Sequence, residues 1–173
     1  GQGYPDFDGP EFAKQAAIAA IQAGHNQYAP MTGLPGLQQA VADHQKRFYG
    51  IDHDPVTDIT IHAGATEAVC ATFLALLAPG DEAIVFEPFY DAYLPGIALA
   101  QAKARIVPLA PPDFRLDPKA LEAAVGPKTR LLVLNSPGNP SGRVFTREEL
   151  AAIAAVCVKR DLLVVTDEVY EHI

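Results

Sequence analysis

From residue 59 onward, short runs rich in apolar and β-branched residues alternate with longer segments of helical periodicity. This alternation is typical of βαβ units, in which a helix connects two parallel strands. The runs are almost continuously apolar, as expected for strands that are buried on both faces of a sheet. The expected strands are residues 59–61, 83–86, 104–107, 131–134 and 162–165. The sequence therefore predicts an α/β fold with a mostly parallel sheet.

Helices are expected in the segments between these runs. Their expected ranges are residues 67–77, 91–100, 118–124 and 147–159. The last has the clearest signals, because Thr146 with Glu149 three positions later fits a capping box. Its apolar face consists of Leu150, Ile153, Ala154 and Cys157. We expect that face to pack on the sheet. The first 55 residues contain no convincing strand and suggest an arm and an entry helix, with helices near 10–23 and 34–48.

Composition excludes several classes of protein. The 173 residues carry 13 Lys and Arg against 21 Asp and Glu, a net charge of −8, and no basic cluster that would neutralise nucleic acid phosphates. The longest largely apolar run, residues 68–78, is far shorter than the roughly 20 residues that span a bilayer. Cys70 and Cys157 lack any C-x-x-C spacing, which indicates a reducing, cytoplasmic compartment. None of the five histidines has metal-site spacing, so no metal is expected.

Ligands of open parallel sheets bind beyond the carboxyl ends of the strands. After residue 61, a small-residue turn with Gly64, Ala65 and Thr66 leads directly into a helix. The free N–H groups and positive dipole end of such a helix bind phosphate, and the Thr66 hydroxyl adds a donor. The same residues also fit an ordinary helix N-cap. They lack the spacing of loops that bind nucleoside triphosphates or dinucleotides.

Three further strand ends carry polar or aromatic residues. Asn139 precedes a proline, which favours an extended backbone and can hold its amide toward the strand ends, although the segment also fits a tight turn. Asp167 is a carboxylate at the end of an apolar strand, which is costly unless it is paired; it either caps the following turn or faces a bound cation. Tyr90 offers an aromatic face at the same edge, a feature also common in cores.

Taken in order, these motifs resemble the fold-type I aminotransferases that use pyridoxal 5′-phosphate. The matching segments are GATEA (64–68), EPFYDAY (87–93), NSPGNPSG (135–142), DEVY (167–170), GQGYPDF (1–7) and YAPMTGLPGL (28–37). They are most similar to the kynurenine, methionine and N-succinyldiaminopimelate aminotransferase group. The resemblance implies a three-layer α/β/α large domain, incomplete in this chain, over residues 31–173. It also implies an N-terminal arm and the start of a small domain over residues 1–30.

The resemblance also implies a role for each matching position. The backbone of Ala65 and Thr66 would hold the cofactor phosphate, and Tyr90 would stack on the pyridine ring. Asp167 would pair with the pyridine nitrogen. A carboxylate about 4 Å from a charged nitrogen supplies a few kcal/mol at an effective dielectric near 20, which keeps the ring protonated. A protonated ring can accept electrons from a substrate carbon.

The remaining implied positions lie around the substrate. Asn139 would hydrogen-bond the cofactor O3′ and help to hold the substrate carboxylate, and Tyr170 would donate to O3′. Tyr28 would reach the phosphate of a neighbouring subunit, which implies a homodimer. Gly3 would line the substrate site, where a side chain would intrude.

The implied reaction moves an amino group from an amino acid to a 2-oxo acid. A cysteine-conjugate β-lyase would use the same cofactor for a different outcome. A regulator whose aminotransferase-like domain only senses a ligand is a third possibility; its usual basic DNA-binding domain is at odds with the acidic balance of this chain.

Two residues that the family needs have no counterpart here. These are the Schiff-base lysine, which also shuttles the proton, and the arginine that binds the substrate carboxylate. The lysines present are Lys14, Lys46, Lys103, Lys119, Lys128 and Lys159, and none has the expected context. We therefore expect an N-terminal portion of a longer enzyme, ending at an unpaired strand edge.

Overall fold

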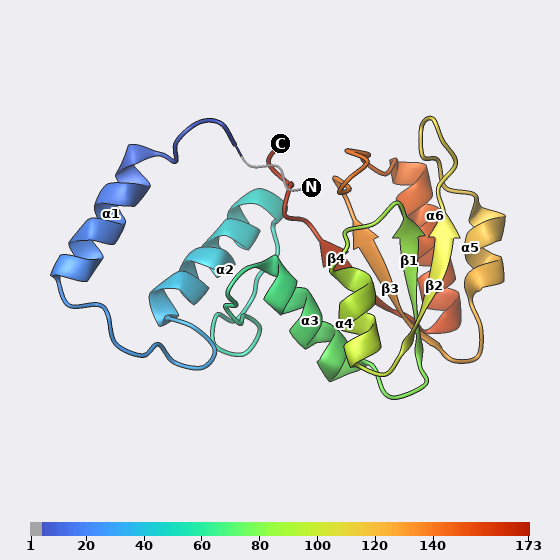
Figure 1. Ribbon diagram of the computed structural model, residues 1–173, viewed down its shortest axis with the longest axis horizontal. Helices are drawn as coiled ribbons and strands as arrows, with labels where there is room; N and C mark the ends of the chain where they lie inside the picture. Colours follow the sequence, from blue (N-terminus) through green and yellow to red (C-terminus); the bar gives the residue numbers. More distant parts are fainter. Residues whose placement is uncertain (1–4) are drawn as a thin grey trace. The chain divides into compact units, whose positions relative to one another are not determined.

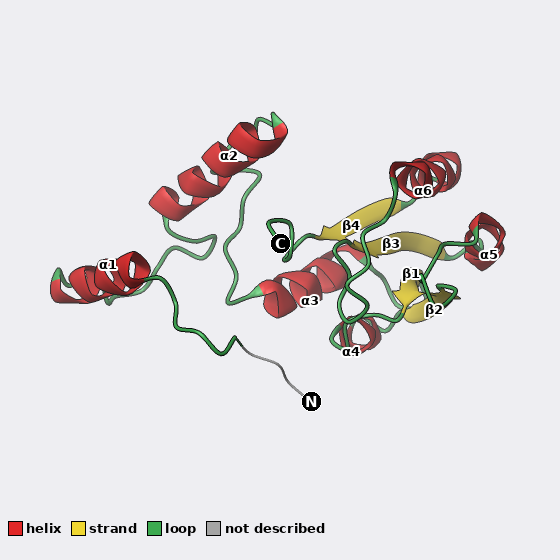
Figure 2. Ribbon diagram, turned by 90° about the horizontal axis from the view of Figure 1, so that it is seen from above, coloured by secondary structure: helices red, strands yellow, loops and turns green. Residues whose placement is uncertain are grey.

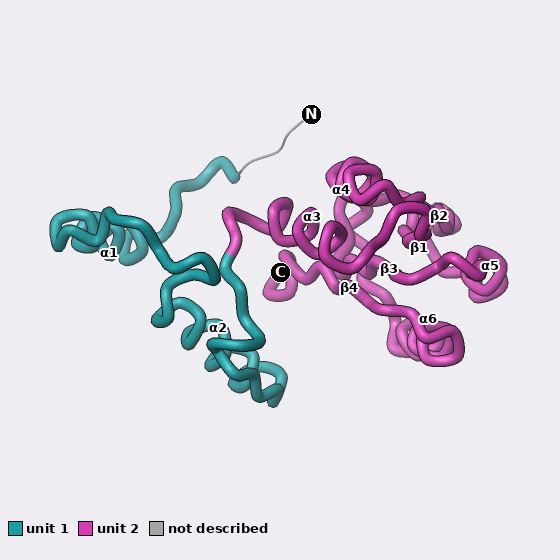
Figure 3. Tube along the Cα trace, turned by 90° about the horizontal axis from the view of Figure 1, so that it is seen from below, with its two compact units in different colours: residues 1–61 teal, residues 62–173 magenta. Residues whose placement is uncertain are grey.

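The computed structural model describes residues 5–173, which belong to two compact units, Gly1–Ile61 and His62–Ile173 (Figure 3). The first unit contains helices α1 (Glu11–Gln22) and α2 (Pro35–Tyr49), close to the two expected ranges. The second unit contains all the strands of the described chain. The domain boundary that the resemblance places near residue 30 stays a prediction.

The second unit is built on four parallel strands in the order β2-β1-β3-β4 (Figure 1). The strands are β1 (Glu82–Glu87), β2 (Lys103–Pro108), β3 (Thr129–Asn135) and β4 (Leu163–Asp167). The helices are α3 (Ala65–Leu76), α4 (Tyr93–Leu99), α5 (Pro118–Ala124) and α6 (Arg147–Arg160). Four of the five expected strands and all four expected helices are confirmed. No helix within residues 5–173 is long and apolar enough to cross a membrane.

Alternate side chains of the central strands enter two different cores. Ile84 and Phe86 of β1 pack with α5 and α6, whereas Ala83 and Val85 pack with α3 and α4. Strand β3 divides in the same way. Figure 2 shows the resulting layers, with α3 and α4 on one face of the sheet and α5 and α6 on the other. The predicted α/β/α arrangement follows from this period of two along each strand.

Burial on both faces holds for β1 and β3 but not for the outer strands. Ile106 of β2 is 45% exposed, and Leu163 and Val164 of β4 are 49% and 44% exposed. Four of the apolar runs therefore predicted strands correctly, but the pattern overestimated the burial of β2 and β4.

The expected strand at residues 59–61 does not form, and that prediction was wrong. The backbone groups of this segment have partners within the first unit instead. The side chain of Gln38 donates to the carbonyl of Ile59 (2.8 Å), and the N–H of Ile61 donates to the carbonyl of Thr32 (2.9 Å). Gly33 makes this approach possible, because a Cβ there would lie 2.4 Å from Cγ1 of Ile61. Apolar character in this segment reflects local packing, not sheet pairing.

Helix α6 begins with the predicted capping box. The Thr146 hydroxyl accepts from the backbone N–H of Glu149 (3.3 Å), and the Glu149 carboxylate accepts from the backbone N–H of Thr146 (2.9 Å). The buried face differs from the expected one: Ile153, Val156 and Cys157 are buried. Leu150 is 38% exposed and Ala154 is also exposed, so the buried stripe is rotated around the helix toward Val156 relative to the expected one.

Candidate functional site

The strand order places a crevice at the carboxyl ends of β1 and β3. The chain leaves β1 toward β2 on one side and leaves β3 toward β4 on the other. The segments that follow these two strands therefore part from each other at the carboxyl edge. Ligands of open α/β sheets bind at such a switch point. Tyr90 and Asn139 lie on the two diverging segments.

A cavity of about 140 Å³ lies at this edge, within the second unit. Its lining residues are Ala65, Thr66, Tyr90, Asn135, Asn139, Asp167, Val169 and Tyr170. The structure thus brings together six residues that the sequence singled out, from four segments far apart in the chain. Tyr28 belongs to the first unit and is fully exposed. Gly3 lies outside the described residues.

One side of the cavity is formed by the start of α3. Its N-cap is Gly64, with φ 93° and ψ 163°, a conformation that is essentially restricted to glycine. No side chain caps the helix, so the N–H groups of its first turn are available to a ligand. A Cβ at Gly64 would have no atom within 4 Å, which shows open space beside the turn. The Thr66 and Tyr90 hydroxyls lie 3.1 Å apart at the same end.

Asp167 lines the cavity at the end of β4 and is half-buried. The Tyr93 hydroxyl donates to its Oδ2 (2.6 Å), and the backbone N–H of Val169 donates to its Oδ1 (3.3 Å). Burial raises the pKa of Tyr93, and the hydrogen bond to Asp167 raises it further, so this phenol remains a neutral donor. No lysine or arginine of the described chain forms an ion pair with Asp167. Its charge is therefore available to a cation in the cavity.

Asn135 holds the neighbouring loop in place. Its side-chain amide donates to the carbonyl of Asp167 (2.9 Å), and its Oδ1 accepts from the backbone N–H of Asn139 (2.7 Å). Sequence reasoning did not assign a role to Asn135. The sequence feature that could have indicated it is an amide side chain directly after the apolar run at residues 131–134.

The loop that carries Asn139 is also attached to α6. The carbonyl of Arg143 accepts from the N–H of Gly138 (2.8 Å), and its guanidinium forms an ion pair with the Glu149 carboxylate. Burial would raise the pKa of Glu149. The backbone N–H groups of Thr146 and Leu116, together with Arg143, outweigh burial and lower it to about 2. Glu149 therefore anchors the loop as a carboxylate.

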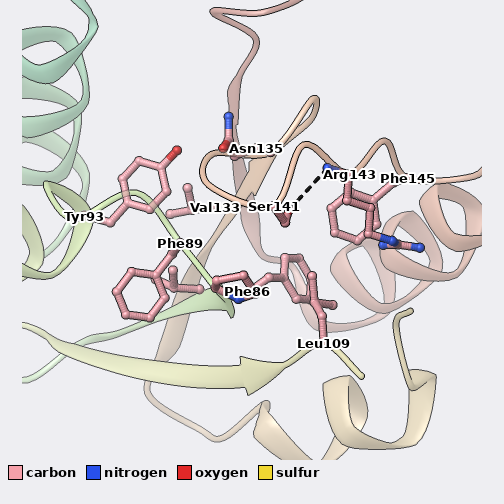
Figure 4. Close-up of a pocket in the computed structure, with 12 residues that line it drawn as sticks. Phe86, Phe89, Tyr93, Leu109, Val133, Asn135, Ser141, Arg143 and Phe145 are labelled. Atoms are coloured by element: carbon pink, nitrogen blue, oxygen red, sulfur yellow. Dashed lines mark hydrogen bonds between the residues drawn. The ribbon is translucent and has the colours of Figure 1, made fainter. Parts of the chain in front are cut away.

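Figure 4 shows a smaller cavity, about 20 Å³, next to this loop. Tyr93 and Asn135 lie on its upper side in this view, and Asn135 also lines the candidate site, whereas Phe86, Leu109 and Phe145 belong to its apolar part. The guanidinium of Arg143 lies 4.6 Å from the ring centre of Phe145. The side chains that support the site thus rest on the hydrophobic core, which restricts their movement.

The 140 Å³ cavity continues on both sides. A space of about 550 Å³ shares Thr66 and Tyr90 with it, and another of about 350 Å³ shares Asn139 and Tyr170. A ligand larger than the central cavity can therefore extend along the edge. The lining combines N–H and hydroxyl donors, an aromatic face and a carboxylate. This combination suits a flat aromatic ligand that carries both an anionic group and a cationic nitrogen.

Comparison with protein families finds a match over the whole chain. The model for aminotransferases of class I and II matches residues 1–173. The probable N-succinyldiaminopimelate aminotransferase DapC of Mycobacterium tuberculosis is 50% identical over 175 residues. That alignment covers 100% of this chain and 44% of the relative.

Solved structures agree with this match. N-succinyldiaminopimelate aminotransferase from M. tuberculosis superposes with a TM-score of 0.97 at 50% identity, over 100% of this chain and 46% of that one. YbdL from Escherichia coli, identified as having a methionine aminotransferase function, gives 0.96 at 44% identity, over 99% of this chain and 46% of that one. The chain spans less than half the length of these relatives.

Proposed function

Since the chain belongs to the class I and II aminotransferase family, we propose that the complete protein moves an amino group from an amino acid to a 2-oxo acid, using pyridoxal 5′-phosphate. Members of this family generally depend on that cofactor. The observation that carries the proposal is the single cavity lined by Ala65, Thr66, Tyr90, Asn139, Asp167 and Tyr170. The relatives described above are named as aminotransferases, which favours this reaction over a β-lyase or a ligand sensor.

The described residues fit the cofactor. The uncapped start of α3 and the open space at Gly64 suit a phosphate, which the N–H groups of Ala65 and Thr66 would bind. Tyr90 would support one face of the pyridine ring. Asp167 would bind the N–H of the protonated ring nitrogen. Donors and carboxylate are thus distributed as the charges of the cofactor require.

When bound, pyridoxal phosphate withdraws electrons from the substrate Cα and so weakens the Cα–H bond. Asp167 would keep a proton on the ring nitrogen through its negative charge. Its carboxylate accepts hydrogen bonds from the Tyr93 hydroxyl and the Val169 N–H. Tyr170 would donate its hydroxyl proton toward O3′. The Asn139 amide would donate to the same oxygen and to the substrate carboxylate. Asn135 orients this amide because it fixes the Asn139 backbone.

The same proposal includes further positions. Tyr28, whose side chain is fully exposed, would reach the phosphate of a second subunit in a homodimer. Gly3 would leave room for the substrate. The free thiols Cys70 and Cys157 are compatible with a cytoplasmic location.

The test uses the complete protein with added pyridoxal 5′-phosphate. We expect a visible absorbance band from the bound cofactor, and borohydride should fix the cofactor to a lysine outside residues 1–173. An amino acid and a 2-oxo acid should then exchange their amino group. Pyruvate, ammonia and a thiol from a cysteine conjugate, without amino transfer, would instead indicate a lyase. Binding of cofactor or amino acid without any turnover would indicate a sensor and overturn the proposal.

A further inference from the structure

Tyr93 contacts Asp167, but it is not one of the described residues that line the 140 Å³ cavity. We propose that Tyr93 is a positioning residue, whose hydroxyl fixes the Asp167 carboxylate in the orientation that binds a protonated ring nitrogen. This inference rests on the function proposed above, since it concerns the same carboxylate. It adds a residue that acts on the ring nitrogen through Asp167.

Tyr93 is held firmly enough to orient another group. It is the first residue of α4 and only 1% exposed. It belongs to the core cluster that includes Val133 and Ile97. A side chain packed in this way is confined to one rotamer by its neighbours. The position of its hydroxyl is therefore set by the core and not by the ligand.

The hydrogen bond has the length of a charge-assisted contact. The Tyr93 hydroxyl lies 2.6 Å from Oδ2 of Asp167, within the range of an O–H donor to a carboxylate. Oδ1 is held separately by the N–H of Val169. Two tethers from different elements, α4 and the segment after β4, restrict rotation of the carboxylate. Turning it away would leave a buried phenol without a partner, which is unfavourable.

Packing alone does not account for a tyrosine at this position. A phenylalanine would fill the same apolar space without needing a polar partner. Tyr93 also meets the ring of Tyr90 edge to face, with ring centres 5.8 Å apart at 80°. The same side chain thus touches both the carboxylate and the aromatic face of the site.

The experiment measures the protonation of the ring nitrogen directly. The complete enzyme is loaded with pyridoxal 5′-phosphate labelled with ¹⁵N in the ring, and the ¹⁵N chemical shift is followed against pH. Tyr93→Phe removes only the hydroxyl. We expect the pH at which the ring nitrogen loses its proton to fall by about one unit, a tenfold weaker hold on the proton. An unchanged titration would overturn the proposal.

Two controls separate positioning from general loss of packing. Thr129→Val removes another buried hydroxyl, at the amino end of β3, which bonds Gly126 and Glu82. This variant should leave the nitrogen titration unchanged. If it shifts the titration as much as Tyr93→Phe does, the effect is structural and the proposal fails. Tyr93→Met, which also lacks the donor but fills irregular space, should reproduce the shift and serves if Tyr93→Phe does not fold.

The Asp167→Asn background distinguishes this inference from the proposed function. In that background, Tyr93→Phe should cause no further shift, because the charge through which it acts is gone. A further shift there would show that Tyr93 acts by another route and would overturn the inference. If Asp167→Asn itself leaves the wild-type titration unchanged, the proposed role of Asp167 fails. If Asp167→Asn shifts the titration and Tyr93→Phe does not, only the role of Tyr93 fails.

Discussion

Asn135 and Asp167 are joined twice: they are register partners on β3 and β4, and the Asn135 amide donates to the Asp167 carbonyl over 2.9 Å. The other end of the same amide accepts from the N–H of Asn139. One side chain therefore connects two strand ends and the loop beside them. Any ligand that uses Asn139 and Asp167 depends on this connection.

Asn135→Ala should lower the free energy of unfolding by about 1 to 3 kcal/mol, because the partly buried N–H of Asn139 loses its partner and the Asp167 carbonyl keeps only the N–H of Ser136. Asn139→Ala is the matched comparison: its backbone N–H still binds Asn135, so stability should change by no more than about 0.5 kcal/mol. Urea denaturation of the complete protein measures both. Under the proposed function, Asn139→Ala should nevertheless reduce amino transfer. Equal destabilisation by the two variants would contradict this assignment.

Asp167→Asn should reduce the rate of the amino acid half-reaction about 10²- to 10³-fold. Removing the charge loses a few kcal/mol of interaction with the protonated ring. Each increase of about 1.36 kcal/mol in the activation free energy lowers the rate tenfold. The fold should persist, since asparagine retains the backbone contacts of Asp167 with β3. Single-turnover kinetics and circular dichroism measure the two effects. A folded variant with the wild-type rate would exclude Asp167 from the site.

The stability of the complete protein should depend on Glu149 at acid pH. The pKa of Glu149 is lowered from 4.5 to about 2 in the fold, so its contribution is present above pH 4.5. That contribution, up to about 3 kcal/mol, is lost as the pH falls from about 5 to 2. Glu149→Gln should reduce this pH dependence, measured by denaturation at several pH values. The exposed neighbour provides the control, and Glu148→Gln should retain the dependence.

Gly33→Ala should destabilise the first unit strongly. Its φ is 109°, and the added Cβ would meet two side-chain atoms of Ile61 at 2.4 and 2.6 Å. Gly36→Ala is the matched control, because Gly36 lies in α2 with nothing within 4 Å of its Cβ position. That change should leave stability unaltered or raise it by up to about 1 kcal/mol. The unfolding temperature should therefore fall clearly in Gly33→Ala and stay the same or rise in Gly36→Ala.

Much of the second unit could be predicted because hydrophobic pattern and burial agree there. The run at residues 131–134 is apolar throughout, and β3 is indeed covered on both faces. The pattern failed at residues 59–61, where Gln38 satisfies the backbone of Ile59. A short apolar run has the same composition in a sheet and in a packed loop. Only long-range partners distinguish the two.

The candidate site was predicted from residues that follow expected strands, and the cavity contains six of them. Two of the six, Ala65 and Thr66, follow a segment that does not form a strand. The supporting residues Asn135 and Tyr93 were not assigned, although both stand inside recognised motifs. Their roles depend on strand register and on the packing of α4. These bring Asn135 and Tyr93 into contact with Asp167, although they are 32 and 74 positions away from it in the sequence. Neither relationship is visible in local spacing.

Because Asn135 pairs with Asp167, the site forms only when β3 and β4 are aligned in the correct register. A slip of β4 by a single position would send every side chain of that strand to the opposite face, and the carboxylate would leave the cavity. A molecule that binds there recognises only chains whose strands have aligned correctly. By mass action, such a molecule would shift misaligned chains toward the native alignment, so that ligand binding also favours the correctly paired sheet.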